Sequence, residues 1–399
     1  ILLIIYISMY IKEEKIRDIE IEDILLSREM LIQHGEELGR TFKIGKKIDV
    51  KNFLLLNLDK NFKQIEKIYL DLNRVANRDL PKASEWLLDN FYIIELQYKE
   101  IRENLEKEKE LNLNTLESGL LKGYPRVYIL AIELISHTEG VLNEETLVDF
   151  IKAYQKESIL SIKEISILPL MLTLALMEYI KNICVEIKAT NQQWKKADEI
   201  DLSQVEDIER YIEEIDDIDS SYLARLVLRM KKGDIETSIF SLEKRLNYLG
   251  TSIESTIEKE HINQANMKVK MGNCIISLKN ISDFKWVSIF DKLCIVEMIL
   301  KKDPLKVYEN MDLESKNYYR YHVQKLAKNL NVKEIFIAKK ALELAKYEYD
   351  KGDKGKKSHI GYYIIDSGRE EIFSSLSRTD GMKGLYLNTE KYYTCLLYT

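Results

Sequence analysis

Glycine, proline and cysteine are scarce in this sequence. Its 399 residues include 15 Gly, 4 Pro and 4 Cys, whereas Ile, Leu, Glu and Lys are abundant. Few turn-forming residues and many straight-chain ones favour long helices with charged outer faces. We therefore predict an all-α fold of several helices, arranged in two helical subdomains.

The cysteines exclude two kinds of site. Cys184, Cys274, Cys294 and Cys395 lie far apart, with no CxxC pair and no histidine at metal-ligand spacing. A structural zinc site and a disulfide framework are therefore not indicated. We expect reduced thiols in the core of an intracellular region.

An excess of positive charge is also lacking. The chain has 60 Lys and Arg against 66 Asp and Glu, a net charge of -6, with both signs interleaved. Such a balance gives no reason to expect nucleic acid as a partner. A content of 45% hydrophobic and 32% charged residues also argues against disorder and against a polytopic membrane protein.

Long hydrophobic runs are few. Residues 1–11 are uncharged but too short to span a bilayer, which needs about 20 residues. We interpret them as the last turns of a membrane helix, or else as the start of an ordinary amphipathic helix. The apolar run Ile165–Met177 contains Pro169 and predicts a buried core helix.

Composition divides the chain further. We predict a helical subdomain at 12–188, a polar linker at 189–201 and a second helical subdomain at 202–350. A basic, Gly-rich linker at 351–361 precedes residues 362–399, which would lead toward a membrane region. Within that last segment, YYIID at 362–366 suggests a short extended stretch.

Familiar catalytic motifs are absent. The sequence has no GxGxxG, GxxxxGK[ST], HExxH or GxSxG. Asp217 and Asp219 form a DxD, a pattern that can hold a divalent metal against a sugar-nucleotide diphosphate. Because this pair follows a helical pattern within a long acidic run, we interpret it as a solvated helix end. No metal site and no cofactor site are predicted.

Trp86, Asn90 and Gln97 lie on one predicted helix. The two amides lie seven residues apart at the margin of its apolar stripe, where each needs a hydrogen-bond partner. They could bind a sugar beside Trp86, or they could hold a neighbouring helix. The structural interpretation is favoured.

A complete buried helix, with signals for both of its ends, is predicted within residues 123–140, GYPRVYILAIELISHTEG. Pro125 suits its start, and His137 with Gly140 suits its end. Glu133 and His137 lie four residues apart, so they can also pair. Arg126 is unfavourable beside the positive end of the helix dipole. We therefore expect it to pair with a carboxylate of a neighbouring helix, with Asp89 and Glu95 the first candidates.

His261 follows two glutamates. Helical spacing places it on one face with Glu254 and Glu258. This arrangement could support general acid–base chemistry within a pocket, but an ion-paired surface or interface is the simpler interpretation.

Four long segments together resemble the amino-terminal region of cyclic β-1,2-glucan synthases. They occur in that family's order and at similar spacing, and GYYIIDSGR (361–369) resembles the stretch before its membrane helices. The segments are EWLLDNFYIIELQYKEIRE (85–103), GYPRVYILAIELISHTEG with FIKAYQ (123–155), EKEHINQANMKVKMGNCIISLKNIS (258–282) and DPLKVYENMDLESKNYYRYHVQKLA (303–327).

The resemblance implies an accessory, non-catalytic segment of a large enzyme of the bacterial inner membrane. That enzyme would combine a family 84 glucosyltransferase with a family 94 phosphorylase-like part, and would use UDP-glucose and a divalent metal. This chain has no QxxRW motif, so no catalytic residue is carried over. Its partners would be the glucosyltransferase and membrane domains of the same polypeptide, with this segment on the cytoplasmic side.

Two other functions remain open. The chain could be a carbohydrate-binding module whose Trp86, Asn90, Gln97 and Arg126 contact β-1,2-glucan. It could also be a helical scaffold for oligomerisation.

Overall fold

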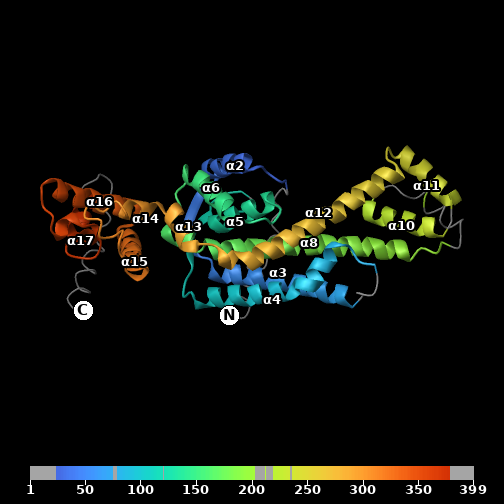
Figure 1. Cartoon of the computed structure of the whole chain (residues 1–399), viewed down its shortest axis with the longest axis horizontal. Coiled ribbons are helices and arrows are strands. Elements are labelled where there is room, and N and C mark those ends of the chain that lie inside the picture. The colour runs from blue at the N-terminus through green and yellow to red at the C-terminus, as the bar shows by residue number, and fades with distance from the viewer. Residues whose placement is uncertain are drawn as a thin grey trace, which may run out of the picture. The chain divides into compact units, whose positions relative to one another are not determined.

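The computed structural model describes residues 24–74, 79–119, 121–202, 212, 219–233 and 236–377. This part of the chain is predominantly helical, with one small two-stranded sheet (Figure 1). The predicted all-α class is confirmed. Residues 1–11, Asp217 of the DxD and residues 378–399 lie outside the described residues.

The chain forms two compact units. Unit 1 contains the described residues up to Leu31 with Lys43–Asn143 and Pro169–Phe284, and unit 2 contains Ile32–Phe42, Glu144–Leu168 and the described residues from Lys285 onward. Helix α2 (Arg28–Thr41) and helix α8 (Leu168–Asp198) each contribute residues to both units.

Long helices build most of unit 1. They are α3 (Lys51–Asn73), α4 (Ala83–Lys107), α5 (Arg126–His137), α8, α10 (Ser220–Lys232), α11 (Glu236–Tyr248) and α12 (Ile253–Asn280), followed by the 3-10 turn η1 (Ile281–Asp283). Helix α4 packs against both α3 and α12, and α10 packs against α12 (Figure 1). The predicted helical stripe of α4 is buried through Leu87, Ile94, Ile101 and Leu105.

The polar stretch predicted as a linker at 189–201 is helical as far as Asp198. Its charged side chains Lys195, Lys196 and Asp198 are exposed, whereas Thr190, Asn191 and Ala197 are buried, at 7%, 9% and 0% exposed. A run rich in charged and amide side chains therefore continues a helix here and does not end it.

A short antiparallel sheet was not predicted. Strand β1 (Ile44–Asp49) pairs with β2 (Asn112–Leu116), with Ile44 opposite Leu116 and Asp49 opposite Asn112. Both strands are short and polar, and they lie more than 60 residues apart in the chain. No local periodicity could therefore reveal the pairing.

Unit 2 consists of shorter helices. They are α6 (Glu144–Gln155), α7 (Ile162–Ser166), α13 (Trp286–Leu293), α14 (Ile295–Leu300), α15 (Leu313–Leu330), α16 (Glu334–Asp350), η2 (Lys356–Ser358), α17 (Ile360–Ile364) and α18 (Arg369–Ser377). Helices α13 and α14 are separated at Cys294, whose backbone is extended.

The extended stretch expected at 362–366 is instead part of α17. Ile360, Tyr363 and Ile364 are all 0% exposed, and their i, i+3, i+4 spacing buries one face of a helical turn. The basic linker expected at 351–361 includes η2 and the fully buried Ser358. The last part of this segment is therefore packed within unit 2.

By length and composition alone, α8 is the one helix in the described part of the chain that could cross a membrane. Its most apolar window has a mean hydropathy of 1.4, and 78% of that window is buried. This burial agrees with the core helix predicted from Ile165–Met177.

Three cysteines lie where a core was expected. Cys184, Cys274 and Cys294 are buried, whereas Cys395 lies outside the described residues. Burial raises the pKa of the Cys294 thiol to about 12 and that of Cys184 further still.

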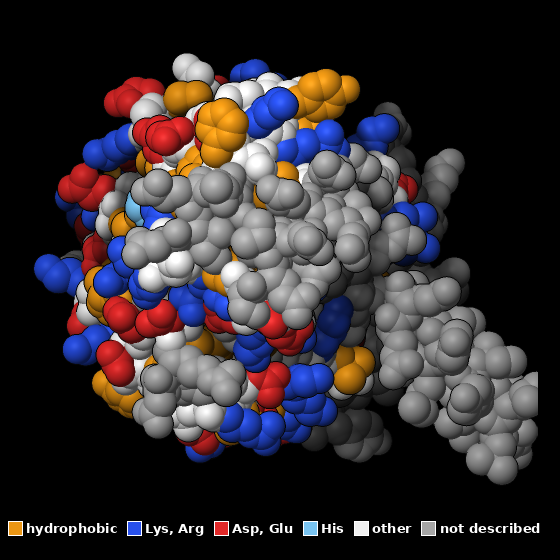
Figure 2. Space-filling model, turned by 90° about the vertical axis from the view of Figure 1, so that its right-hand side faces the viewer, with side chains coloured by type: hydrophobic (Ala, Val, Ile, Leu, Met, Phe, Trp, Pro, Cys, Tyr) orange, Lys and Arg blue, Asp and Glu red, His pale blue; other side chains and the backbone are white. Residues whose placement is uncertain are grey.

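Figure 2 shows Lys and Arg side chains among Asp and Glu side chains on the face that it presents.

We predict that replacing Gly140, in the turn after α5, by a residue with a side chain lowers the stability of the fold. Gly140 has a φ of 80°, and an added Cβ would lie 2.4 Å from the Cys274 sulfur. We expect Gly140→Ala to lower the free energy of unfolding by about 3 kcal/mol, combining left-handed strain with overpacking. Urea unfolding followed by circular dichroism measures it.

Gly250→Ala is the matched control. Gly250 has a φ of 83°, but an added Cβ there meets nothing within 4 Å. Only the backbone strain of about 1 kcal/mol should remain. Equal losses at the two glycines would show that the contact with Cys274 does not matter.

Candidate functional site

Trp86 is a contact between helices. It is half-buried, and its indole carbons lie 3.4 Å from the position that a Cβ on Gly272 would occupy. The missing side chain at Gly272 thus lets the indole of α4 lie close to the backbone of α12. Trp86 is therefore not an isolated, exposed platform for a sugar ring.

Asn90 and Gln97 form hydrogen bonds within their own helix. Asn90 Nδ2 donates to the Trp86 carbonyl oxygen at 3.0 Å, and Gln97 Nε2 donates to Glu100 Oε2 at 3.2 Å. The structure does not bring the two amides together around one point. Their role as sugar ligands stays a prediction.

Arg126, the first residue of α5, is only 3% exposed. Its burial agrees with the expectation that it is held inside the protein. Of the two carboxylates suggested for it, Glu95 pairs with Lys99 at 2.8 Å. The identity of the partner of Arg126 stays a prediction.

His137, the last residue of α5, is 7% exposed and contacts two groups in unit 1. Its Nε2 lies 3.4 Å from Glu133 Oε2, as the four-residue spacing predicted, and its Nδ1 lies 2.7 Å from the Ile24 carbonyl oxygen. Because a carbonyl only accepts, Nδ1 carries a proton and donates. The ring thus joins the end of α5 to the backbone before α2.

The turn after His137 binds α12. Asn273 Nδ2 donates to the Glu139 carbonyl oxygen at 3.0 Å, and Ser277 Oγ donates to that of Gly140 at 2.7 Å. Two segments of the family resemblance therefore meet through backbone carbonyls. The turn at residues 137–140 thus attaches the end of α5 to α12.

His261 lines an open groove of about 440 Å³ on α12. Glu254 and Glu258 line the same groove, which confirms that the three side chains share a face. Ile257 and Ile262 supply apolar walls, and Lys231 of α10 closes one side. Whether this histidine acts as an acid or base stays a prediction.

A buried charge network joins α3, α5 and α8. Glu178 Oε2 accepts hydrogen bonds from Asn61 Nδ2 at 2.6 Å and from Asn57 Nδ2 at 3.3 Å, and Tyr128 donates to it at 3.3 Å. Its other oxygen lies 3.1 Å from Lys181 Nζ, and both charged side chains are at most 4% exposed. These atoms are enclosed by helices, so they stabilise packing and are not open to a substrate.

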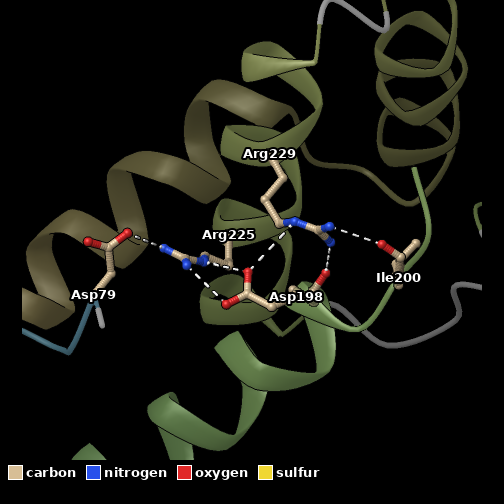
Figure 3. A network of polar contacts seen from close by, with 6 residues as sticks. Asp79, Asp198, Ile200, Arg225 and Arg229 are labelled. Atoms are coloured by element: carbon tan, nitrogen blue, oxygen red, sulfur yellow. Dashed lines mark hydrogen bonds and ion pairs between the residues drawn. The ribbon is translucent and has the colours of Figure 1, made fainter. Parts of the chain in front are cut away.

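A second network fixes the end of α8 against α10 (Figure 3). Nε and Nη2 of Arg225 donate to the two carboxylate oxygens of Asp198 at 2.8 and 2.9 Å, and Nη1 donates to Asp79 Oδ2 at 3.1 Å. Arg229 donates to the carbonyl oxygens of Ala197 and Ile200. Arginine suits this place because the last carbonyls of a helix lack partners and carry partial negative charge.

This docking brings the first turn of α10 to a polar cleft of about 350 Å³ beside α8 and α12. Amides, hydroxyls and one pair of opposite charges line it. The polar members are Glu186 and Thr190 of α8, Ser221 of α10, and Asn263, Asn266 and Lys270 of α12.

Buried groups beneath the cleft hold Ser221 in place. Ser221 Oγ donates to Glu260 Oε2 at 2.7 Å, and Gln264 Nε2 donates to Glu260 Oε1 at 2.9 Å. The backbone amide of Lys82 in turn donates to Gln264 Oε1 at 3.2 Å. Glu260 and Gln264 are 3% and 5% exposed, so they form a fixed layer under the cleft.

In unit 2, a fully buried glutamate is the centre of a third network. Glu297 Oε2 accepts from Tyr308 at 2.6 Å and from Arg320 Nε at 2.8 Å, whereas Oε1 has no hydrogen-bond partner among the residues that the structure describes. Arg320 also lies over the Phe290 ring at 4.4 Å. A buried charge of this kind depends on its one cationic partner.

Asp303, His359 and Tyr319 form a chain of hydrogen bonds beside it. His359 Nδ1 donates to Asp303 Oδ2 at 2.8 Å, and Tyr319 donates to His359 Nε2 at 2.7 Å. The order resembles a catalytic triad, but Tyr319 is 9% exposed and burial raises its pKa to about 12. The chain joins the start of α17 to α15 and does not present a nucleophile.

Sequence reasoning missed both arginines of Figure 3 and the residues that line the polar cleft. Arg225 and Arg229 lie four apart on α10, a spacing that places them on one face. The sequence contains that spacing, but the carbonyls and carboxylates that the two arginines bind lie in other segments of the chain. The partners became visible only with the fold.

Removing the charge of Glu297 should destabilise unit 2. We expect Glu297→Gln to lower the free energy of unfolding by about 3 kcal/mol, because it removes the nearer of the two carboxylates that pair with the buried Arg320 and leaves only Asp291 at 3.8 Å. Urea unfolding measures this loss. Glu343→Gln, which removes only an exposed pair with Lys340, should change little, and a similar loss at both sites would contradict the account.

Asp303 should make unit 2 sensitive to acid. Burial alone would raise its pKa, but hydrogen bonds from His359 and from the Ile360 and Tyr308 amides outweigh that effect and lower it from 3.8. A lowered carboxyl pKa stabilises the fold above the unfolded value, and this stabilisation is lost as pH falls through the folded value.

The urea midpoint should therefore decrease below pH 3.8, and Asp303→Asn should remove that part of the decrease. Measured from pH 5 to pH 2.5, roughly the range over which carboxyls titrate, an unchanged slope in the variant would refute the assignment.

No family model matches the chain. The cyclic beta-(1,2)-glucan synthase NdvB of Rhizobium meliloti (strain 1021) is 27% identical to it over 296 residues, which are 71% of this chain and 10% of that protein. The family resemblance stated from the sequence is confirmed. This chain is thus similar over most of its length to a cyclic beta-(1,2)-glucan synthase, and it spans about a tenth of that relative's length.

Proposed function

We propose that this chain is a non-catalytic accessory segment of an enzyme that makes cyclic β-1,2-glucan from UDP-glucose. One observation carries the proposal, namely similarity to a cyclic beta-(1,2)-glucan synthase over 71% of the chain. The sequence contains no GxGxxG, GxxxxGK[ST] or QxxRW motif, and this supports the proposal that catalysis takes place in other parts of that enzyme.

The use of its charged residues supports an accessory role. Glu178, Glu260 and Glu297 are at most 3% exposed and are hydrogen-bonded to neighbouring helices. A catalytic carboxyl needs access to substrate, whereas these groups join helices. The chemistry of the described residues thus favours a rigid helical body that positions other parts of an enzyme.

The partners follow from this role. The segment would dock the glucosyltransferase and membrane domains of its own polypeptide, where UDP-glucose and a divalent metal would act. By its resemblance to the family, we place it on the cytoplasmic side of a bacterial inner membrane. Segment 361–369, which resembles the stretch before that family's membrane helices, would point the chain toward the bilayer.

An assay of the purified chain tests the division of labour. With radiolabelled UDP-glucose, a divalent metal and a β-1,2-glucan acceptor, we expect no glucosyl transfer above the protein-free blank. A complete cyclic glucan synthase serves as the positive control. Turnover by the isolated chain that survives repurification would show that this segment is itself catalytic.

A further inference from the structure

The polar cleft of unit 1 has the composition of a binding site. Its α12 side is formed by Asn263, Asn266 and Lys270, spaced i, i+3, i+7, and its α8 side by Glu186 and Thr190, spaced i, i+4. Both spacings place side chains on one helix face. Two helix faces therefore present their polar groups to the same space of about 350 Å³.

Three of these side chains have unused hydrogen-bonding capacity. Thr190 is only 7% exposed, yet its hydroxyl bonds to none of the residues that the structure describes. The amides of Asn263 and Asn266 also lack partners in the described part of the chain. The hydroxyl of a nearly buried threonine and the amides of two exposed asparagines thus face the cleft with donors and acceptors available.

The charges and the apolar lining restrict the ligand further. Glu186 and Lys270 carry opposite charges, so the lining has no net charge and does not select an anion or a cation. Met267, 6% exposed, and Ala189 add two small apolar contacts. Groups that both donate and accept, beside apolar patches, suit a ring with hydroxyls at its edge and C–H bonds on its face.

The fixed layer beneath the cleft supports this interpretation. Glu260 and Gln264 hold Ser221, and the arginine contacts of Figure 3 hold α10 against α8. A site whose groups are already fixed loses less entropy when a ligand binds.

We propose that the cleft formed by Thr190, Ser221, Asn263 and Asn266 binds a neutral saccharide unit. Resting on the proposed function, we identify that unit as glucose within a β-1,2-linked chain. The segment would then hold the glucan in addition to docking the catalytic parts. This site differs from the residues near Trp86 that the sequence suggested for sugar binding.

Isothermal titration of the full 399-residue chain with the β-1,2-linked disaccharide of glucose tests the site. We expect saturable binding, and we expect Asn263→Ala with Asn266→Ala to raise the dissociation constant about tenfold, through loss of two hydrogen-bonding groups. Thr190→Val should weaken binding in the same direction.

Gln192→Ala is the matched control, since Gln192 is an exposed amide of α8 outside the cleft. It should leave the dissociation constant unchanged, and thermal unfolding should confirm that every variant is folded. No saturable binding by the wild-type chain, or equal binding by the double variant, overturns the site. Either result leaves the accessory role standing, because that role is tested by glucosyl transfer and assembly.

Discussion

The complete burial of α5 is the constraint on which unit 1 depends. All of its side chains are buried, including those of Arg126, Glu133 and His137. A helix enclosed on every side must have its polar groups bonded inside the protein. His137 therefore binds Glu133 and the carbonyl oxygen of Ile24, and the Gly140 carbonyl oxygen accepts a hydrogen bond from Ser277 of α12. The order of the neighbouring helices follows from these contacts.

Charged residues play the same part elsewhere in each unit. Glu178 joins three helices of unit 1, and Glu297 with Arg320 joins helices of unit 2. Buried pairs of this kind contribute little net stability but penalise arrangements that leave one charge unpaired. They thus select one packing of helices. The cleft beside α8 and α12, by contrast, presents neutral polar groups together with Glu186 and Lys270.

The sequence predicted the helices well because their apolar residues repeat at helical spacing, as in α4. It also predicted the stop at Gly140 and the pairing of His137 with Glu133. It could not reveal the pairing of β1 with β2, the cleft or the Arg225 contacts, because each joins segments distant in the chain. The stretch at 189–201, expected to be a polar linker, is helical as far as Asp198 for another reason. Polar composition reports exposure, and one exposed side of α8 looked like a break in the helix.

Reconstitution tests the central claim most directly. The chain, carrying an affinity tag, would be expressed with the separately encoded remainder of a cyclic glucan synthase that lacks the corresponding region. The account predicts that the two parts co-purify in a fixed ratio and that glucosyl transfer from UDP-glucose needs both. Full activity of the remainder alone, with the chain eluting separately, would contradict the claim that this segment assembles with the catalytic parts.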